Sequence, residues 1–136
     1  MKCGVAFVLF FLVMFSSAHF VLQIPSSIGF SDVNEGTAPC GSFDITSRAN
    51  ASNWPVAGQP VAALTTHPES IFQIRAALEN DTNNFVELIP PFVQTGLGYW
   101  CLTAVPGVAA WEGLPAVVQV VQFAADGDLY QVWVET

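Results

Sequence analysis

The chain has 136 residues, of which 52% are hydrophobic and only 10% are charged. Three lysines and arginines stand against eleven aspartates and glutamates, which gives a formal net charge of -8 at pH 7. So acidic a chain cannot neutralise phosphates, which excludes nucleic acid as a partner. The length suits one domain with a single core.

The first eighteen residues have the pattern of a secretory signal peptide. Met1-Lys2 precedes an apolar run from Gly4 to Phe15, which is shorter than the roughly 20 residues that span a bilayer. The small residues Ser16-Ser17-Ala18 follow, as they do before a signal-peptidase cut. We therefore predict a signal peptide over 1–18 and one secreted domain over 19–136 without a transmembrane span. An uncleaved anchor is the alternative.

Cleavage after Ala18 makes His19 the first residue of the mature chain. A free N-terminal histidine offers its α-amine and its ring Nδ1 to the same metal ion, a chelate that no internal histidine forms. The only other histidine is His67. Together they supply three nitrogen ligands, so the sequence predicts a metal site at His19 and His67. The alternative for His67 is a surface or hydrogen-bonded histidine with no metal.

Alternating polar and apolar residues, rich in β-branched and aromatic side chains, predict short strands. These cover Phe20 to Ile24, Ser42 to Thr46, Gln59 to Leu64, Phe72 to Ala76, Phe85 to Ile89, Gly98 to Leu102, Ala116 to Phe123 and Leu129 to Val134. Turns are expected at Pro90-Pro91 and, most clearly, at Ala125-Asp126-Gly127-Asp128. The pattern predicts an all-β fold, an immunoglobulin-like or fibronectin-III-like antiparallel β-sandwich.

Without the signal peptide the chain keeps two cysteines, Cys40 and Cys101. In an oxidising secretory compartment they most simply form one disulfide. The sequons that begin at Asn50 and Asn80 agree with secretion, because each is a potential N-glycan acceptor on a surface loop.

The four tryptophans are expected in the core rather than on a sugar-stacking surface. They are Trp54, Trp100, Trp111 and Trp133. Asp126 and Asp128 are expected to shape and solvate the hairpin turn. Asp32, Glu35 and Asp44 are expected on a solvated face, and the alternative is that they support a metal-bound His19.

Five segments in this order resemble the fungal copper-acquisition factors, a family similar to lytic polysaccharide monooxygenases. They are His19-Phe20-Val21-Leu22-Gln23-Ile24-Pro25, Gly29-Phe30, Pro39-Cys40-Gly41-Ser42-Phe43, Gly98-Tyr99-Trp100-Cys101-Leu102 and Leu129-Tyr130-Gln131. The resemblance implies a β-sandwich that binds one Cu(II) per chain through a histidine brace, made by the amine and Nδ1 of His19 and the ring of His67. It also implies copper acquisition or homeostasis at the cell surface, beside the copper transport machinery and without oxidation of polysaccharide.

The ligand chemistry agrees with copper independently. Imidazole and amine nitrogens suit Cu(II), which heads the affinity order of divalent first-row ions. The α-amine, with an ordinary pKa of about 7.7–8.0, must lose its proton to bind the metal, so affinity is expected to fall as the pH drops.

Two departures from the family concern the end of the chain. Relatives continue the Leu-Tyr-Gln strand with Cys-Ala-Asp, whereas here Gln131 precedes Val132-Trp133-Val134. The resemblance implies that an aspartate of this segment adds an oxygen ligand, so the sequence leaves that ligand open. Relatives also often carry a glycolipid-anchor signal, which this sequence lacks. We expect a secreted protein, or one held at the cell wall or plasma membrane, and a shortened C-terminus explains both departures.

Two other functions remain open. One is a copper-dependent lytic polysaccharide monooxygenase with the same brace, which needs a flat surface with exposed aromatic residues. The other is a structural cell-wall or adhesion module in which the histidines are incidental. A binding protein is favoured over an enzyme because so small a domain offers little length for such a surface.

Overall fold

The computed structural model describes residues 19–48 and 51–135, so the predicted signal peptide and the Asn50 sequon lie outside the described residues. Seven strands and one short 3-10 helix follow in chain order. They are β1 (Phe20–Ile24), β2 (Gln59–Thr65), β3 (Glu69–Leu78), β4 (Val86–Thr95), β5 (Gly98–Val105), η1 (Ala109–Trp111), β6 (Ala116–Ala124) and β7 (Gly127–Glu135). No helix in the described part of the chain is long and apolar enough to cross a membrane.

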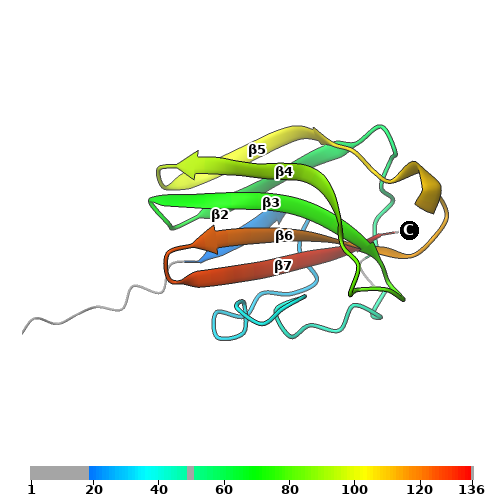
Figure 1. Cartoon of the computed structure of the whole chain (residues 1–136), viewed down its shortest axis with the longest axis horizontal. Helices are drawn as coiled ribbons and strands as arrows, with labels where there is room; N and C mark the ends of the chain where they lie inside the picture. The colour runs from blue at the N-terminus through cyan, green and yellow to red at the C-terminus, as the bar shows by residue number, and fades with distance from the viewer. Residues whose placement is uncertain (1–18, 49–50, 136) are drawn as a thin grey trace, which may run out of the picture.

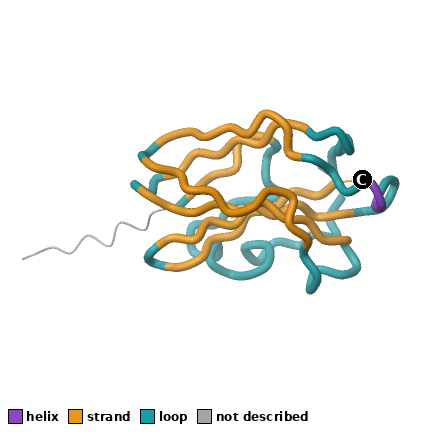
Figure 2. Tube along the Cα trace, turned by 45° about the horizontal axis from the view of Figure 1, so that its top comes forward, coloured by secondary structure: helices purple, strands orange, loops and turns teal. Residues whose placement is uncertain are grey.

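The strands form two antiparallel sheets packed as a sandwich (Figures 1 and 2). One sheet has the order β1-β2-β5 and the other has the order β4-β3-β6-β7. The long connection between β1 and β2 runs beside β7, where the Ile28 N–H donates to the Val132 carbonyl at 2.9 Å. It also covers the outer face of the four-stranded sheet, where the Gln119 amide donates to the Pro39 carbonyl. The predicted all-β antiparallel sandwich is confirmed.

The core between the sheets is aromatic. Phe72 lies at its centre, with ring centroids 4.9 Å from Trp100 and 5.5 Å from Phe20. Trp54 stacks on Trp133 at 4.8 Å. These residues are buried, and Trp111 is half-buried against the same cluster. The tryptophans therefore contribute to the core, as the sequence predicts.

The strand predicted over Ser42 to Thr46 is not formed. Ser42 has a φ of 70°, a left-handed conformation that extended pairing does not allow. The Asp44 carboxylate accepts the Thr46 N–H at 2.9 Å and the Thr46 hydroxyl at 2.7 Å. Such local hydrogen bonds offer the backbone an alternative to a strand.

β4 runs through Pro90-Pro91, where the sequence predicts a turn. Two features permit this. β4 is an edge strand of its sheet, so a missing N–H on its free side breaks no ladder bond. Its register with β3 also shifts between Phe72 and Ile74, and such a bulge accommodates residues that cannot pair.

Gln131 joins the two sheets. Its Oε1 accepts the Leu22 N–H at 3.0 Å, and its Nε2 donates to the Phe20 carbonyl. The same Nε2 donates to Glu35 Oε1 at 2.6 Å. Gln131, on β7 of the four-stranded sheet, thus ties down β1 of the other sheet and one residue of the β1–β2 connection.

The predicted Cys40–Cys101 disulfide is absent, and both thiols are free. Cys40 is buried against Val117, Val132 and Val134 on the outer face of the four-stranded sheet. Cys101 follows the inward-facing Trp100 on β5 and is exposed on the outside of the other sheet. Stacked sheets lie about 10 Å apart, whereas a disulfide requires Cα atoms within about 7 Å.

Replacing Gln131 with alanine is expected to lower the free energy of unfolding by about 2–4 kcal/mol, because it leaves the Leu22 N–H and the Phe20 carbonyl buried without partners. Urea unfolding followed by tryptophan fluorescence measures this change. Gln23→Ala is the matched control, since Gln23 is exposed and its side-chain amide donates to the Val21 carbonyl of its own strand at 3.5 Å, and it should change stability by less than about 0.5 kcal/mol. Equal stability of the two variants would contradict the proposed role of Gln131.

The two cysteines should differ in reactivity toward a thiol reagent. Burial raises the pKa of the Cys40 thiol to about 11, so at pH 8 it is both protonated and inaccessible. Cys101 is exposed and should react in the native protein, whereas Cys40 should react only after unfolding. Mass spectrometry of the labelled protein separates the two sites, and a molecule without free thiols would contradict this prediction.

Candidate metal centre

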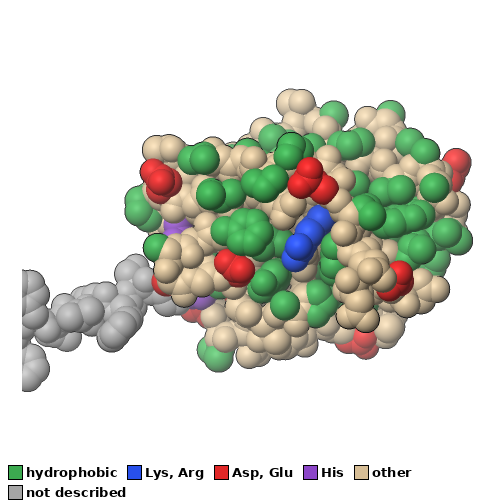
Figure 3. All heavy atoms as spheres, viewed as in Figure 1, with side chains coloured by type: hydrophobic (Ala, Val, Ile, Leu, Met, Phe, Trp, Pro, Cys, Tyr) green, Lys and Arg blue, Asp and Glu red, His purple; other side chains and the backbone are tan. Residues whose placement is uncertain are grey.

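His19 and His67 lie at the same end of the sandwich, because His19 is hydrogen-bonded to the residue before His67. Figure 3 shows histidine side chains at one end of the molecule. His19 precedes β1, and its backbone N–H donates to Thr66 Oγ1 at 2.9 Å. The Thr66 N–H in turn donates to the His19 carbonyl at 3.0 Å. Thr66 is the residue before His67, so pairing of β1 with β2 brings the two histidines to one place.

The His19 ring is held by the connection that follows β1. Its Nε2 lies 2.9 Å from the Asp32 carbonyl, and its Nδ1 lies 3.4 Å from Asp32 Oδ1. The ring also meets Phe30 edge to face, with centroids 6.4 Å apart. A carbonyl that accepts the Nε2–H orients the ring for metal binding through Nδ1, which is the usual orientation of metal-binding histidines. The surroundings of His19 therefore fit chelation through Nδ1.

His67 is 6% exposed and lies in the turn between β2 and β3. Its Nε2 is 3.0 Å from Asp126 Oδ1, and its Nδ1 has no hydrogen-bond partner among the described residues. Two atoms about 3 Å apart can serve as neighbouring ligands of one ion, since metal–nitrogen and metal–oxygen bonds are about 2.0–2.2 Å long. The distance between His67 and Asp126 is therefore compatible with a shared metal ion as well as with a hydrogen bond.

Asp126 is the site residue that the sequence analysis missed, because it was assigned only to the hairpin turn. Its hydrogen bond with His67 lowers its pKa, and the charges of His67 and His19 act in the same direction. Asp126 is thus within electrostatic reach of both histidines. The register explains why: Ile71 pairs with Phe123, so the turn before β3 and the turn after β6 meet.

Glu35 is a buried carboxylate beside His19. Its side chain is almost fully inaccessible, and its Oε2 lies 3.9 Å from His19 Nε2. Burial raises the Glu35 pKa to about 7, although the hydrogen bond from Gln131 and the charge of His19 partly oppose this shift. Of the three carboxylates considered with His19, Asp32 and Glu35 contact it, whereas Asp44 is engaged with Thr46.

The segment that replaces Cys-Ala-Asp carries no side chain that could supply an oxygen ligand. Val132, Trp133 and Val134 are apolar and buried in β7. The aspartates that the structure places beside the histidines are Asp32, against His19, and Asp126, against His67.

A complete metal site is not assembled while residues 1–18 are attached. Within residues 19–48 and 51–135, no three histidine, cysteine, aspartate or glutamate side chains converge on one point. The nitrogen of His19 is still an amide here and donates a hydrogen bond to Thr66. The donor atoms suit copper, and a free α-amine is the one that is missing.

Comparison with known proteins gives matches over most of the chain. The family model of BIM1-like copper acquisition factors matches residues 17–132. An uncharacterised protein of Aspergillus fumigatus is 34% identical over 128 residues, which are 88% of this chain and 52% of that protein. A lytic polysaccharide monooxygenase-like protein, X325 of Yarrowia lipolytica, is 26% identical over 127 residues, which are 85% of this chain and 47% of that protein. The chain spans about half the length of these relatives.

The raised pKa of Glu35 predicts a pH dependence of stability. The folded state holds this proton up to about pH 7, whereas an ordinary glutamate loses it near 4.5. The unfolded state therefore binds fewer protons in this window, and stability should fall by about 2–4 kcal/mol as the pH rises from about 4.5 to 7. Glu35→Gln should remove this part of the decline in urea unfolding curves recorded at both pH values, and an unchanged decline would contradict the assignment.

Proposed function

The chain belongs to the family of BIM1-like copper acquisition factors, and from this premise we propose that its mature form binds one Cu(II) ion at the histidine end of the sandwich. The ion is cargo, which the protein takes up outside the cell or at its surface. The observation that carries the proposal is the contact of His67 with Asp126, at the end of the sandwich where His19 pairs with Thr66, the residue before His67.

The ligands are the α-amine and Nδ1 of His19, a ring nitrogen of His67, and the Asp126 carboxylate. Nitrogen donors suit Cu(II), and a carboxylate adds a negative charge next to a divalent cation. Asp32 and Glu35 do not bind the ion in this scheme. They hold the His19 ring through the Asp32 carbonyl and through the Glu35 contact with Nε2.

Signal-peptide removal is the step that completes the site. Only a cut after Ala18 converts the His19 nitrogen into an amine, so copper binding depends on secretion and correct processing. Asn80 lies exposed in the turn after β3, where an N-glycan has room. A secreted or surface-held location places the protein next to the copper transport machinery that would receive the ion.

Oxidation of polysaccharide is not part of the proposal. Activity on a polymer requires a surface that positions the chain against the metal. The aromatic ring that contacts His19 is Phe30, and its plane stands at 83° to the imidazole, so the two rings do not form one flat platform. The copper-loaded protein with a reductant should release no oxidised oligosaccharides from cellulose or chitin, as judged by mass spectrometry.

The mature protein beginning at His19 should bind one Cu(II) tightly, and one additional residue in front of His19 should weaken binding by about 100-fold or more, because it abolishes the amine ligand. Isothermal titration of the two forms measures the difference. Electron paramagnetic resonance shows whether nitrogen ligands are lost. Equal affinities would rule out the brace.

Asp126→Asn should weaken Cu(II) binding by about 10- to 100-fold, as loss of a group at a metal site commonly does. Asp128→Asn is the matched control, because Asp128 lies two residues further along the same hairpin and is exposed. Its affinity should match that of the unaltered protein. If both variants bind equally well, Asp126 is not a ligand.

A further inference from the structure

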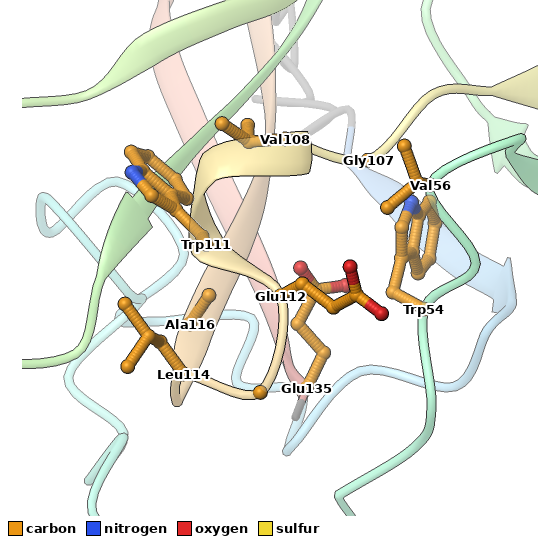
Figure 4. Close-up of a pocket in the computed structure, with 10 residues that line it drawn as sticks. Trp54, Val56, Gly107, Val108, Trp111, Glu112, Leu114, Ala116 and Glu135 are labelled. Atoms are coloured by element: carbon orange, nitrogen blue, oxygen red, sulfur yellow. The ribbon is translucent and has the colours of Figure 1, made fainter.

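A polar cavity lies at the opposite end of the sandwich from the histidines. It has a volume of about 70 Å³ and is enclosed by η1, the start of β6 and the end of β7 (Figure 4). Glu135, one of its lining residues, is nine positions beyond Asp126, which corresponds to roughly 30 Å along an extended strand. The cavity is therefore separate from the proposed copper site.

Glu135 contributes a buried carboxylate to this cavity. It is 8% exposed, and its Oε2 has no hydrogen-bond partner among the described residues. Figure 4 shows its carboxylate pointing into the cavity. Burial raises the Glu135 pKa to about 7, against the opposing charge of Arg48. A buried carboxylate without a partner costs free energy, so the cavity favours a ligand that donates hydrogen bonds.

The other walls favour a positive charge on that ligand. Glu112 is an exposed second carboxylate that lines the cavity, and Figure 4 shows it beside Glu135 in this view. Two indoles, Trp54 and Trp111, also line it, and indole faces attract cations. None of the described lining residues is a lysine, arginine or histidine.

Gly107 packs closely against the Trp54 side chain that lines the cavity. A Cβ atom at this position would lie 3.0 Å from Trp54 Cδ1 and 3.2 Å from the Pro55 carbonyl oxygen. A side chain at this position would therefore require Trp54 or the neighbouring backbone to shift by a few tenths of an ångström. The cavity is thus part of the packed end of the sandwich and not a gap between loose loops.

We propose that this cavity binds a primary ammonium group on a short unbranched alkyl chain, of the kind that ends a lysine side chain. The ammonium group lies against Glu135 and Glu112, and the alkyl chain lies against the indole rings. At about 15 Å³ per water-sized atom, a volume of 70 Å³ admits about five heavy atoms. A calcium ion fits less well, because it takes six to eight oxygen ligands and two carboxylate side chains line the cavity.

The test uses the full chain and n-butylammonium chloride, which has five heavy atoms. Tryptophan fluorescence and indole N–H shifts should change saturably at millimolar concentrations. The neutral isostere n-butanol should bind at least about 10-fold more weakly, because it lacks the charge. D-glucosamine, whose ammonium group stands on a ring, should not compete.

Glu135→Gln should weaken n-butylammonium binding by about 10-fold or more, and Glu112→Gln, at an exposed position, should weaken it by about 3-fold or more. Glu87→Gln is the control, because Glu87 lies on β4 with its carboxylate bonded to Gln73. Circular dichroism confirms that each variant is folded. Copper affinity, measured on forms of each variant that begin at His19, should not change, so this proposal and the copper proposal can fail separately.

Three results would overturn the proposal. The first is equal binding of n-butanol, which would show an apolar cavity with no preference for charge. The second is saturable binding of calcium with displacement of n-butylammonium, which would show a metal site. The third is equal binding of D-glucosamine, which would assign the cavity to amino sugars.

Discussion

The side-chain amide of Gln131 is the interaction on which the geometry of the histidine end depends. It lies buried on β7 and binds the backbone of β1 on both sides of Val21, at the Phe20 carbonyl and the Leu22 N–H. It also fixes Glu35. Because His19 directly precedes Phe20, the first of the proposed ligand residues adjoins a strand, β1, that pairs within its own sheet and is also hydrogen-bonded to β7 of the other sheet. An N-terminal residue would otherwise fray.

Antiparallel pairing then determines what gathers at each end of the sandwich. The turns before β3 and after β6 meet at the histidine end, which brings His67 to Asp126. The opposite ends of β6 and β7 pair Ala116 with Glu135 beside η1. Each end thus has its own acidic site. The two sites share a scaffold but no side chain.

Two buried glutamates, one at each end of the sandwich, share a raised pKa but differ in their surroundings. Burial raises the pKa of Glu35 and of Glu135 to about 7. Glu35 Oε1 accepts a hydrogen bond from Gln131, and His19 lies nearby. Neither Glu35 Oε2 nor Glu135 Oε2 has a hydrogen-bond partner among the described residues. An acidic chain that buries carboxylates at both ends is suited to ligands that carry positive charge.

The sequence by itself determined the β-sandwich, most of the strands and the pair of histidines, because alternation of apolar residues is a local property and His19 follows a cleavage pattern directly. Tertiary structure alone decided the rest. From the sequence Asp126 is expected only to form a turn, whereas the pairing of β3 with β6 places it against His67. The sequence predicts a disulfide between Cys40 and Cys101, but the two cysteines lie on the outer faces of different sheets. The sequence also predicts a turn at Pro90-Pro91, but β4 is an edge strand and continues through both prolines. In each case the deciding contact joins residues distant in the chain, and which distant residues meet depends on sheet order and register.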